Sequence, residues 1–213
     1  MMRADPSAVE HLRRVDPVMR RVIREVGPCT LAPRRRRSPF ESLARAIAYQ
    51  QLHDKAAASI LRRFVSLFPG RRFPRPDEVL ATPAGAIRQA GFSRPKVEAL
   101  RDLAVKTLDR TVPTNRIITR MDDEAIIGRL VQVRGIGRWT VEMLLIFQLG
   151  RPDILPVDDF GVRNGFRVAY GLGDMPTPSE VLRHGERWKP HRTTAAWYLW
   201  RVADRAKQGP ATI

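Results

Sequence analysis

Apolar residues recur at intervals of three and four along almost the whole chain, and this period limits the fold more than any other feature does. Phe40, Leu43 and Ile47, for example, would lie on one face of a helix. The spacing predicts helices at residues 8–23 with a break or end at Pro17, 40–51, 56–67, 94–108, 122–131, 138–149, 159–170, 178–187 and 191–207. No segment alternates apolar and polar residues as a β-strand would, so the chain is predicted to be all-α.

The chain of 213 residues is long enough for one large domain or for two small lobes around a real core. We treat residues 1–213 as one domain, in which helical regions at 40–112 and 113–207 form two lobes. Residues 1–39 would supply an N-terminal helix and a basic linker. The run Arg34–Arg37 in that linker is predicted to be solvated, with a phosphate clamp as the alternative.

Basic residues outnumber acidic residues by 38 to 22, which gives a formal net charge of +16. Such a field concentrates polyanions and favours phosphate contacts. Arginine greatly exceeds lysine, as the codon use of a high-GC genome would produce, but codon use does not explain the excess of basic over acidic residues. The charge therefore indicates a nucleic-acid partner.

Cys29 is the only cysteine in the sequence. A single cysteine excludes an intrachain disulfide framework, a zinc ribbon and a four-cysteine iron–sulfur cluster. No apolar run approaches the roughly 20 residues that span a bilayer, and the N-terminus lacks the apolar core of a signal peptide. We therefore expect no membrane association and a cytoplasmic, nucleoid-associated location, or a nuclear one in a eukaryote. A monomer is the default expectation.

Residues 130–142 are the most informative segment, with an apolar helix end, then Gly135-Ile136-Gly137, then a second helix from Arg138. Glycines permit a tight turn and let the main chain approach a ligand closely. The first amides of the second helix have no acceptor within it, and such amides bind phosphate groups. The alternative is an ordinary helical hairpin with a glycine after its first helix.

A loop at residues 150–157 and then Asp158-Asp159 follow this hairpin. The combination resembles the helix-hairpin-helix DNA glycosylase superfamily and, within it, the alkylation-repair branch of DNA-3-methyladenine glycosylase II. The segments that carry the resemblance are residues 46–52, 91–93 with Lys96, 135–140, and 188–190 leading to Trp200. The resemblance implies a two-lobed helical fold with a DNA cleft between the lobes, and double-stranded DNA with alkylated bases as the partner. The hairpin residues that would contact DNA are Arg134, Gly135, Ile136, Gly137, Arg138 and Thr140.

Asp159 stands where the superfamily has its catalytic aspartate. Cleavage of an N-glycosidic bond builds positive charge on the deoxyribose, and a nearby carboxylate stabilises that charge and orients or deprotonates water. The residues alone favour a helix N-cap for Asp159, a role that Asp158 would fill equally well. The resemblance implies that Asp159 is catalytic and that Asp158 is structural.

Members of the superfamily that also cut the strand carry a lysine shortly after the second hairpin glycine, and its amine forms a Schiff base with the sugar. Trp139 occupies that position, and no lysine lies between Lys106 and Lys189. We therefore predict that water removes a flipped base and leaves an abasic site without strand cleavage. The alternatives are a glycosylase for deaminated or mismatched bases and a non-catalytic DNA-binding module.

Trp139 and Trp200 match base-pocket positions of the family, where aromatic rings attract cationic alkylated purines, and core packing is the alternative. Met143 stands where the alkylation enzymes often carry a pocket tyrosine. Gln51 and Leu52 match the loop that inserts a wedge into the vacated space. The alternative for them is an exposed helix end with Leu52 in the core.

Arg192 is predicted to bind a phosphate or to support Asp159. No cofactor is expected to be required, and an iron–sulfur cluster is excluded by the cysteine count. The resemblance adds a potassium or sodium ion held by hairpin carbonyl groups near Val133 and Gly135.

Overall fold

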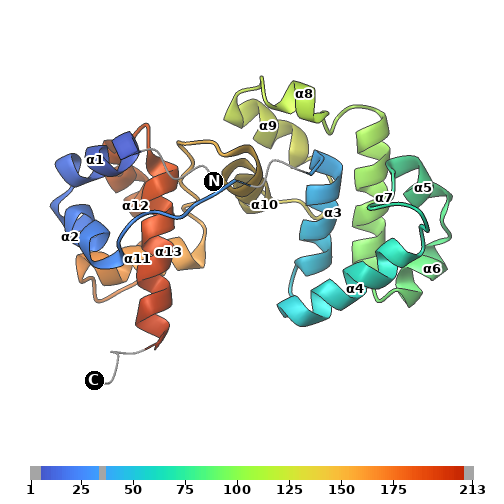
Figure 1. The fold of residues 1–213 in the computed structure, drawn as a ribbon, viewed down its shortest axis with the longest axis horizontal. Helices are drawn as coiled ribbons and strands as arrows, with labels where there is room; N and C mark the ends of the chain where they lie inside the picture. The colour runs from blue at the N-terminus through green and yellow to red at the C-terminus, as the bar shows by residue number, and fades with distance from the viewer. Residues whose placement is uncertain (1–5, 34–36, 209–213) are drawn as a thin grey trace. The chain divides into compact units, whose positions relative to one another are not determined.

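The structure, a computed structural model, describes residues 6–33 and 37–208. The elements in chain order are α1 (Pro6–Val15), α2 (Pro17–Val26), α3 (Pro39–Tyr49), α4 (Asp54–Ser66), α5 (Pro76–Ala81), α6 (Ala84–Gln89), α7 (Arg94–Leu108), α8 (Asn115–Ile118), α9 (Asp123–Leu130), α10 (Arg138–Leu144), the π-helix η1 (Leu145–Leu149), α11 (Phe160–Tyr170), α12 (Pro178–Gly185), the 3₁₀-helix η2 (Glu186–Trp188) and α13 (Arg192–Gln208). Every regular element in the described ranges is helical, which confirms the all-α prediction (Figure 1). Arg34–Arg36 of the predicted linker lie outside the described residues. Within the ranges given, no helix combines the length and the apolar character that crossing a membrane requires.

Contacts within the chain group it into two units. The terminal unit contains the described parts of residues 1–35 and 145–213, and the central unit contains those of residues 36–144. This grouping differs from the expected lobes at 40–112 and 113–207. The hairpin groups with the segment before it, and the N-terminal helices group with the C-terminal half of the chain.

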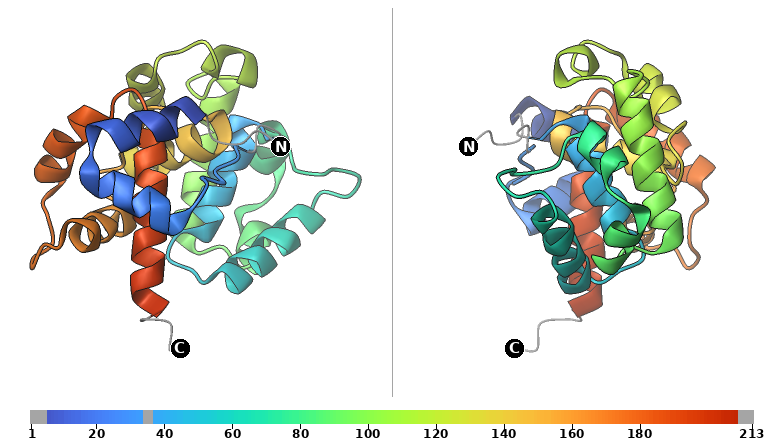
Figure 2. Two further views of the ribbon diagram at one scale, coloured as in Figure 1. Left: turned by 60° about the vertical axis from the view of Figure 1, so that its left-hand side comes forward. Right: turned by 90° about the vertical axis from the view of Figure 1, so that its right-hand side faces the viewer.

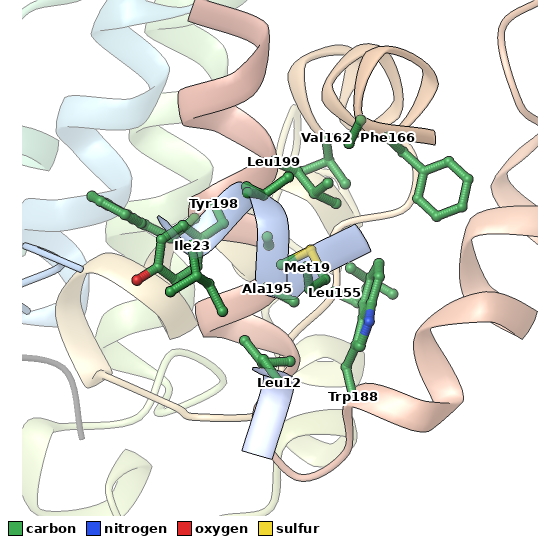
Figure 3. Packing of buried hydrophobic residues seen from close by; sticks show 14 of the residues in the cluster. Leu12, Met19, Ile23, Leu155, Val162, Phe166, Trp188, Ala195, Tyr198 and Leu199 are labelled. Atoms are coloured by element: carbon green, nitrogen blue, oxygen red, sulfur yellow. The ribbon is translucent and has the colours of Figure 1, made fainter. Parts of the chain in front are cut away.

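The core of the terminal unit explains why the N-terminal helices belong to it. Its buried side chains come from α1 and α2 as well as from η2, α11 and α13 (Figure 3). The members include Leu12, Met19, Ile23, Leu155, Val162, Phe166, Trp188, Ala195, Tyr198 and Leu199. Helices α1 and α2 therefore contribute buried apolar side chains to the same core as the C-terminal half, and burying such surface is the main driving force of folding.

Helices α11 and α13 pack against each other at a very short distance. A Cβ atom added to Gly165 of α11 would lie 2.0 Å from the carbonyl oxygen of Leu199 in α13. Only glycine fits at this crossing, so the apolar faces of the two helices meet directly. This packing fixes the positions of the side chains at the start of α11 and in the middle of α13.

A buried carboxylate joins α1 and α2 to the rest of the terminal unit. Asp16 is only 1% exposed and caps α2, because its Oδ1 accepts hydrogen bonds from the amides of Val18 at 2.9 Å and Met19 at 3.1 Å. Pro17 at the first helical position explains the break between α1 and α2. The other oxygen, Oδ2, accepts from the Tyr170 hydroxyl and from Trp188 Nε1 at 2.9 Å.

His184 completes this network, with Nε2 3.0 Å from Asp16 Oδ2 and 2.9 Å from the Tyr170 hydroxyl. Burial by itself would raise the pKa of Asp16. The hydrogen bonds from His184, Tyr170 and Trp188 outweigh burial and hold that pKa well below its usual range. Burial and the Asp16 carboxylate together raise the pKa of Tyr170 far above its ordinary value.

The central unit is built around α3 and α7, which lie side by side (Figures 1 and 2). Ile47 of α3 and Leu100 of α7 are fully buried. Phe64 of α4 contacts the rings of Phe68, Phe73 and Phe92 at centroid distances of 5.3–6.1 Å. Helix α10 contacts α3 and α9, so the hairpin between α9 and α10 rests on the same core.

The Asp16 network leads to a stability prediction. We expect Asp16→Asn to lower the free energy of unfolding at pH 7 by about 3 kcal/mol, because an amide nitrogen would face donors that need a buried acceptor. The folded-state pKa of Asp16 lies below the unfolded value of about 3.9, so its stabilisation is complete above that pH and is lost as the pH falls through the folded pKa. The difference between wild type and variant should therefore shrink below about pH 4.

Urea denaturation at pH 7, 4 and 3 measures this effect. Asp174→Asn, at an exposed position of the same unit, is the matched control and should change the unfolding free energy little at any of these pH values. A difference between wild type and Asp16→Asn that stays constant with pH would contradict the assignment of an ionised Asp16.

Candidate active site

The hairpin has the geometry that its glycines predict. Gly135 has a φ of +76°, in the left-handed region that favours glycine. Ile136 is 4% exposed and anchors the turn in the core of the central unit. The carbonyl oxygen of Gly137 accepts hydrogen bonds from the amides of Thr140 and Val141, so α10 begins directly after the turn.

Two hairpin arginines predicted to contact DNA are ion-paired within the central unit. Nη2 of Arg134 lies 2.8 Å from Glu98, and its amide donates to Asp102 Oδ2 at 2.7 Å. Nε of Arg138 lies 3.1 Å from Glu142, and its Nη1 donates to Glu124 at 3.0 Å. Their charge is thus balanced by carboxylates in this structure, and DNA contact by either guanidinium stays a prediction.

The predicted wedge lies at an exposed corner after α3. Gln51 and Leu52 are both exposed, and Leu52 is 40% accessible, so it is not the core residue of the alternative interpretation. Gln51 has a φ of +55°, which is unusual for a residue with a side chain. Nε2 of Gln50 donates to the Gly135 carbonyl at 2.8 Å, so the structure brings this corner and the hairpin together.

Asp159 is the N-cap of α11, as its residue type alone suggested. Its Oδ1 accepts hydrogen bonds from the Val162 amide and from Trp200 Nε1, both at 2.8 Å. A Cβ atom on Gly161 would lie 2.8 Å from Trp200 Cδ1 and 3.0 Å from Asp159 Oδ1, so a glycine there leaves room for this pair. Asp158 is exposed and does not cap the helix. Two donors thus hold the half-buried carboxylate of Asp159 in one orientation.

Trp200 forms an aromatic pair next to this carboxylate. Its ring stacks on Phe147 with a centroid distance of 5.5 Å and an interplanar angle of 26°. Phe147 is 42% exposed, so the pair reaches solvent. The sequence interpretation missed Phe147 because it expected one α-helix over 138–149, whereas the chain changes to a π-helix at Leu145. Such π segments are often found at functional sites.

Trp139 and Met143 lie one turn apart on α10, in the central unit. Trp139 is 46% exposed, which argues against the core packing considered for it. Met143 is partly buried at the position where the sequence departs from the expected tyrosine. Their part in a base pocket stays a prediction.

Arg192 contacts Asp153 in this structure, and its expected roles, binding a phosphate or supporting Asp159, stay predictions. Its Nε and Nη2 donate to the two carboxylate oxygens of Asp153 at 2.8 and 2.9 Å, in a two-pronged ion pair. Thr193 reinforces this link, since its hydroxyl donates to the Arg151 carbonyl at 2.7 Å and accepts from the Ile154 amide at 2.9 Å. The start of α13 is thereby fixed to the loop that leads to Asp159. Asp153 was not identified from the sequence, where it was one acidic residue in a loop.

The described residues contain no group of three His, Cys, Asp or Glu side chains that would hold a metal ion. The predicted monovalent ion would use main-chain oxygens instead. The Val133 carbonyl accepts from the Ile136 amide at 3.0 Å, and the Gly135 carbonyl accepts from Gln50. Each oxygen keeps a second lone pair, so these groups fit a weakly bound cation, which stays a prediction.

The chain is similar to known DNA repair proteins in sequence. A family model described as "HhH-GPD superfamily base excision DNA repair protein" matches residues 44–191. DNA-3-methyladenine glycosylase 1 of Schizosaccharomyces pombe is 43% identical over 199 residues, which cover 92% of this chain and 86% of that protein. DNA-3-methyladenine glycosylase 2 of Escherichia coli is 30% identical over 169 residues, which cover 76% of this chain and 56% of that protein.

Solved structures show the same similarity. The S. pombe 3-methyladenine DNA glycosylase Mag1 in complex with abasic DNA matches with a TM-score of 0.80 at 43% identity, covering 92% of this chain and 95% of that chain. A DNA-3-methyladenine glycosidase from Bacillus halodurans matches with a TM-score of 0.88 at 30% identity, covering 98% and 94%.

The contact between Gly161, Asp159 and Trp200 can be tested by Gly161→Ala. The added methyl group would push Trp200 away from Asp159, so we expect the indole N–H resonance of Trp200 to move toward the position of an indole without this hydrogen bond. Nitrogen–proton correlation spectra measure the shift, with the resonance assigned by Trp200→Phe. Gly173→Ala, where a Cβ would meet nothing within 4 Å, is the control. An unchanged Trp200 resonance in Gly161→Ala would contradict the described geometry.

Proposed function

Because this chain belongs to the HhH-GPD superfamily of base excision DNA repair proteins, we propose that it is a DNA glycosylase that removes alkylated purines such as 3-methyladenine and 7-methylguanine. Double-stranded DNA is the substrate, and the product is an abasic site. The S. pombe relative, with 43% identity over almost the whole chain, is named for the removal of 3-methyladenine and is solved with abasic DNA. The net charge of +16 fits this polyanionic substrate.

The observation that carries the proposal is the carboxylate of Asp159, held by two N–H donors. As the glycosidic bond breaks, positive charge develops on the deoxyribose. A carboxylate that is already oriented stabilises this charge without reorganising during the reaction. Trp200 and the Val162 amide are the groups that orient it, and both bind Oδ1. In this proposal the cap and the catalyst are the same side chain.

The stacked rings of Phe147 and Trp200 support a preference for alkylated bases. Alkylation of a ring nitrogen makes a purine cationic, and the face of an aromatic ring attracts a cation by about 1–2 kcal/mol when water is excluded. The partly exposed Phe147 ring lies against Trp200, which itself contacts the proposed catalytic carboxylate. A cationic base near these groups would therefore have both an aromatic surface and a nearby negative charge.

The nucleophile in this proposal is water. Trp139 occupies the position at which strand-cutting relatives carry a lysine, and an indole cannot form an imine. No amine at residue 139 can therefore attack the sugar. The role of Asp159 is to stabilise charge and to orient or deprotonate the water. Base removal should therefore leave the DNA strand intact.

Release of free bases tests the proposal directly. Duplexes that contain 3-methyladenine, 7-methylguanine, uracil or hypoxanthine are incubated with the protein, and the released bases are separated chromatographically. We expect both methylated purines to be released, and Asp159→Asn to lower the rate about 10²–10³-fold, because one stabiliser of the transition-state charge is lost. Asparagine caps helices as well as aspartate does, so the variant should fold.

Asp158→Asn is the matched control, and its rate should stay within about twofold of wild type because this side chain is exposed. Full activity of Asp159→Asn would overturn the mechanism. Release of uracil or hypoxanthine alone would point to a glycosylase for deaminated bases, and binding without any release would point to a non-catalytic module.

Borohydride trapping tests the nature of the nucleophile. Borohydride reduces a Schiff base to a stable covalent bond, so an enzyme that uses an amine becomes linked to its DNA. We expect no covalent complex between the wild-type protein and methylated DNA during active base release. A covalent complex on a denaturing gel would contradict water as the nucleophile.

A further inference from the structure

We propose that Lys96 is a positioning residue, which holds the corner Gln50-Gln51-Leu52 in a shape that allows it to enter a DNA duplex. The proposal rests on the glycosylase function above. It assigns a role to a lysine of α7 that belongs neither to the hairpin nor to the corner.

The two hydrogen bonds of Lys96 span the point at which the chain leaves α3. Its Nζ donates to the carbonyl oxygen of Ala48 at 2.9 Å and to that of Gln50 at 2.7 Å. The last carbonyl groups of a helix have no partner within it, and a cation is favourable at that end. Lys96 therefore caps α3 from outside and binds the first residue after it.

The corner needs this support because its main chain is strained. Gln51 has a φ of +55°, in the left-handed region that is unfavourable for a residue with a Cβ atom. Gln51 and Leu52 are also exposed, so packing contributes little to keeping them in place. Lys96 binds the carbonyl directly before Gln51, and this contact opposes relaxation of the corner toward an ordinary conformation.

The same helix that carries Lys96 also holds the hairpin. Glu98, Asp102 and Lys106 follow one another at intervals of one turn on α7 and therefore share a face. Glu98 pairs with the Arg134 guanidinium, Asp102 accepts from the Arg134 amide, and Lys106 donates to the Gln132 carbonyl.

Gln50 then joins the corner to the hairpin through the Gly135 carbonyl at 2.8 Å. Helix α7 thus supports the two segments that the sequence resemblance predicts to contact DNA, the hairpin and the corner. Once the hairpin has bound the DNA backbone, the position of the corner along the duplex is fixed, because both are attached to one helix. Loss of Lys96 would remove the direct support of the corner by α7 and leave the contacts of α7 with the hairpin in place.

The test compares binding with insertion. Lys96→Met keeps most of the aliphatic chain and removes the ammonium, Lys96→Arg restores a cation, and Lys207→Met removes the same charge from an exposed site in the terminal unit. Insertion is measured as the change in fluorescence of 2-aminopurine placed opposite an abasic-site analogue in a duplex. Binding to an undamaged duplex is measured by fluorescence anisotropy at fixed salt.

We expect Lys96→Met to bind undamaged DNA within about twofold of Lys207→Met, because the hairpin and the remaining charge are intact. The 2-aminopurine signal should fall about fivefold and single-turnover base release about tenfold, because a small misplacement of a DNA-contacting group is costly. Lys96→Arg should recover most of both. An unchanged 2-aminopurine signal in Lys96→Met, or an equal loss in Lys207→Met, would overturn the proposal.

Two further results keep the outcome decisive. If Lys96→Met does not fold, Lys96→Leu, another uncharged aliphatic replacement, takes its place and should give the same loss of signal with unchanged binding. If the wild-type protein releases no base but its 2-aminopurine signal still depends on Lys96, the proposed function fails while the positioning role stands. If base release is normal and the 2-aminopurine signal is independent of Lys96, the proposed function stands and the positioning role of Lys96 fails.

Discussion

The buried carboxylate of Asp16 is the contact on which the terminal unit depends. It binds Tyr170 at the last residue of α11, and Asp159 caps the first turn of the same helix. Helix α11 is therefore bound at its C-terminal end by the structural carboxylate of Asp16, and its N-terminal end is capped by the proposed catalytic carboxylate of Asp159. Gly165 lies between them and brings α11 into direct contact with α13, which carries Trp200. Both ends of α11 are therefore bound by carboxylates, and its middle is in direct contact with the helix that carries Trp200.

The central unit positions its functional segments by different means. Here α7 presents charged side chains at its surface, and these bind the main-chain and side-chain groups of the hairpin and of the corner after α3. Exposed ion pairs contribute little to stability, typically below about 1 kcal/mol each. Their effect in this unit is to fix the positions of two short segments relative to one helix. The terminal unit thus uses a buried polar network to position its helices, and the central unit uses contacts at the surface of α7 to position the hairpin and the corner.

The sequence predicts most of the helices because the apolar period is a local signal. The helix starts expected near residues 159 and 178 are correct to within one residue, and in the structure Asp159 and Thr177 cap these helices. The grouping of the chain could not be predicted, because it depends on where Met19 and Ile23 are buried. Phe147 and Asp153 were missed for a related reason. A change to π-helix and an ion pair with Arg192, 39 residues away, leave no periodic signal.

The proposed double role of Asp159, as helix cap and as catalyst, has a consequence for evolution. In the proposed function, Asp159 both caps a helix and acts in the reaction, so two selective pressures restrict this position to different sets of residues. Selection for folding alone would accept Asn, Ser or Thr at this site, because all of them cap helices. Selection for the reaction would accept only a carboxylate at that position. In a duplicated gene that is no longer selected for DNA repair but is still selected for folding, this position should therefore change first to other residues that cap helices.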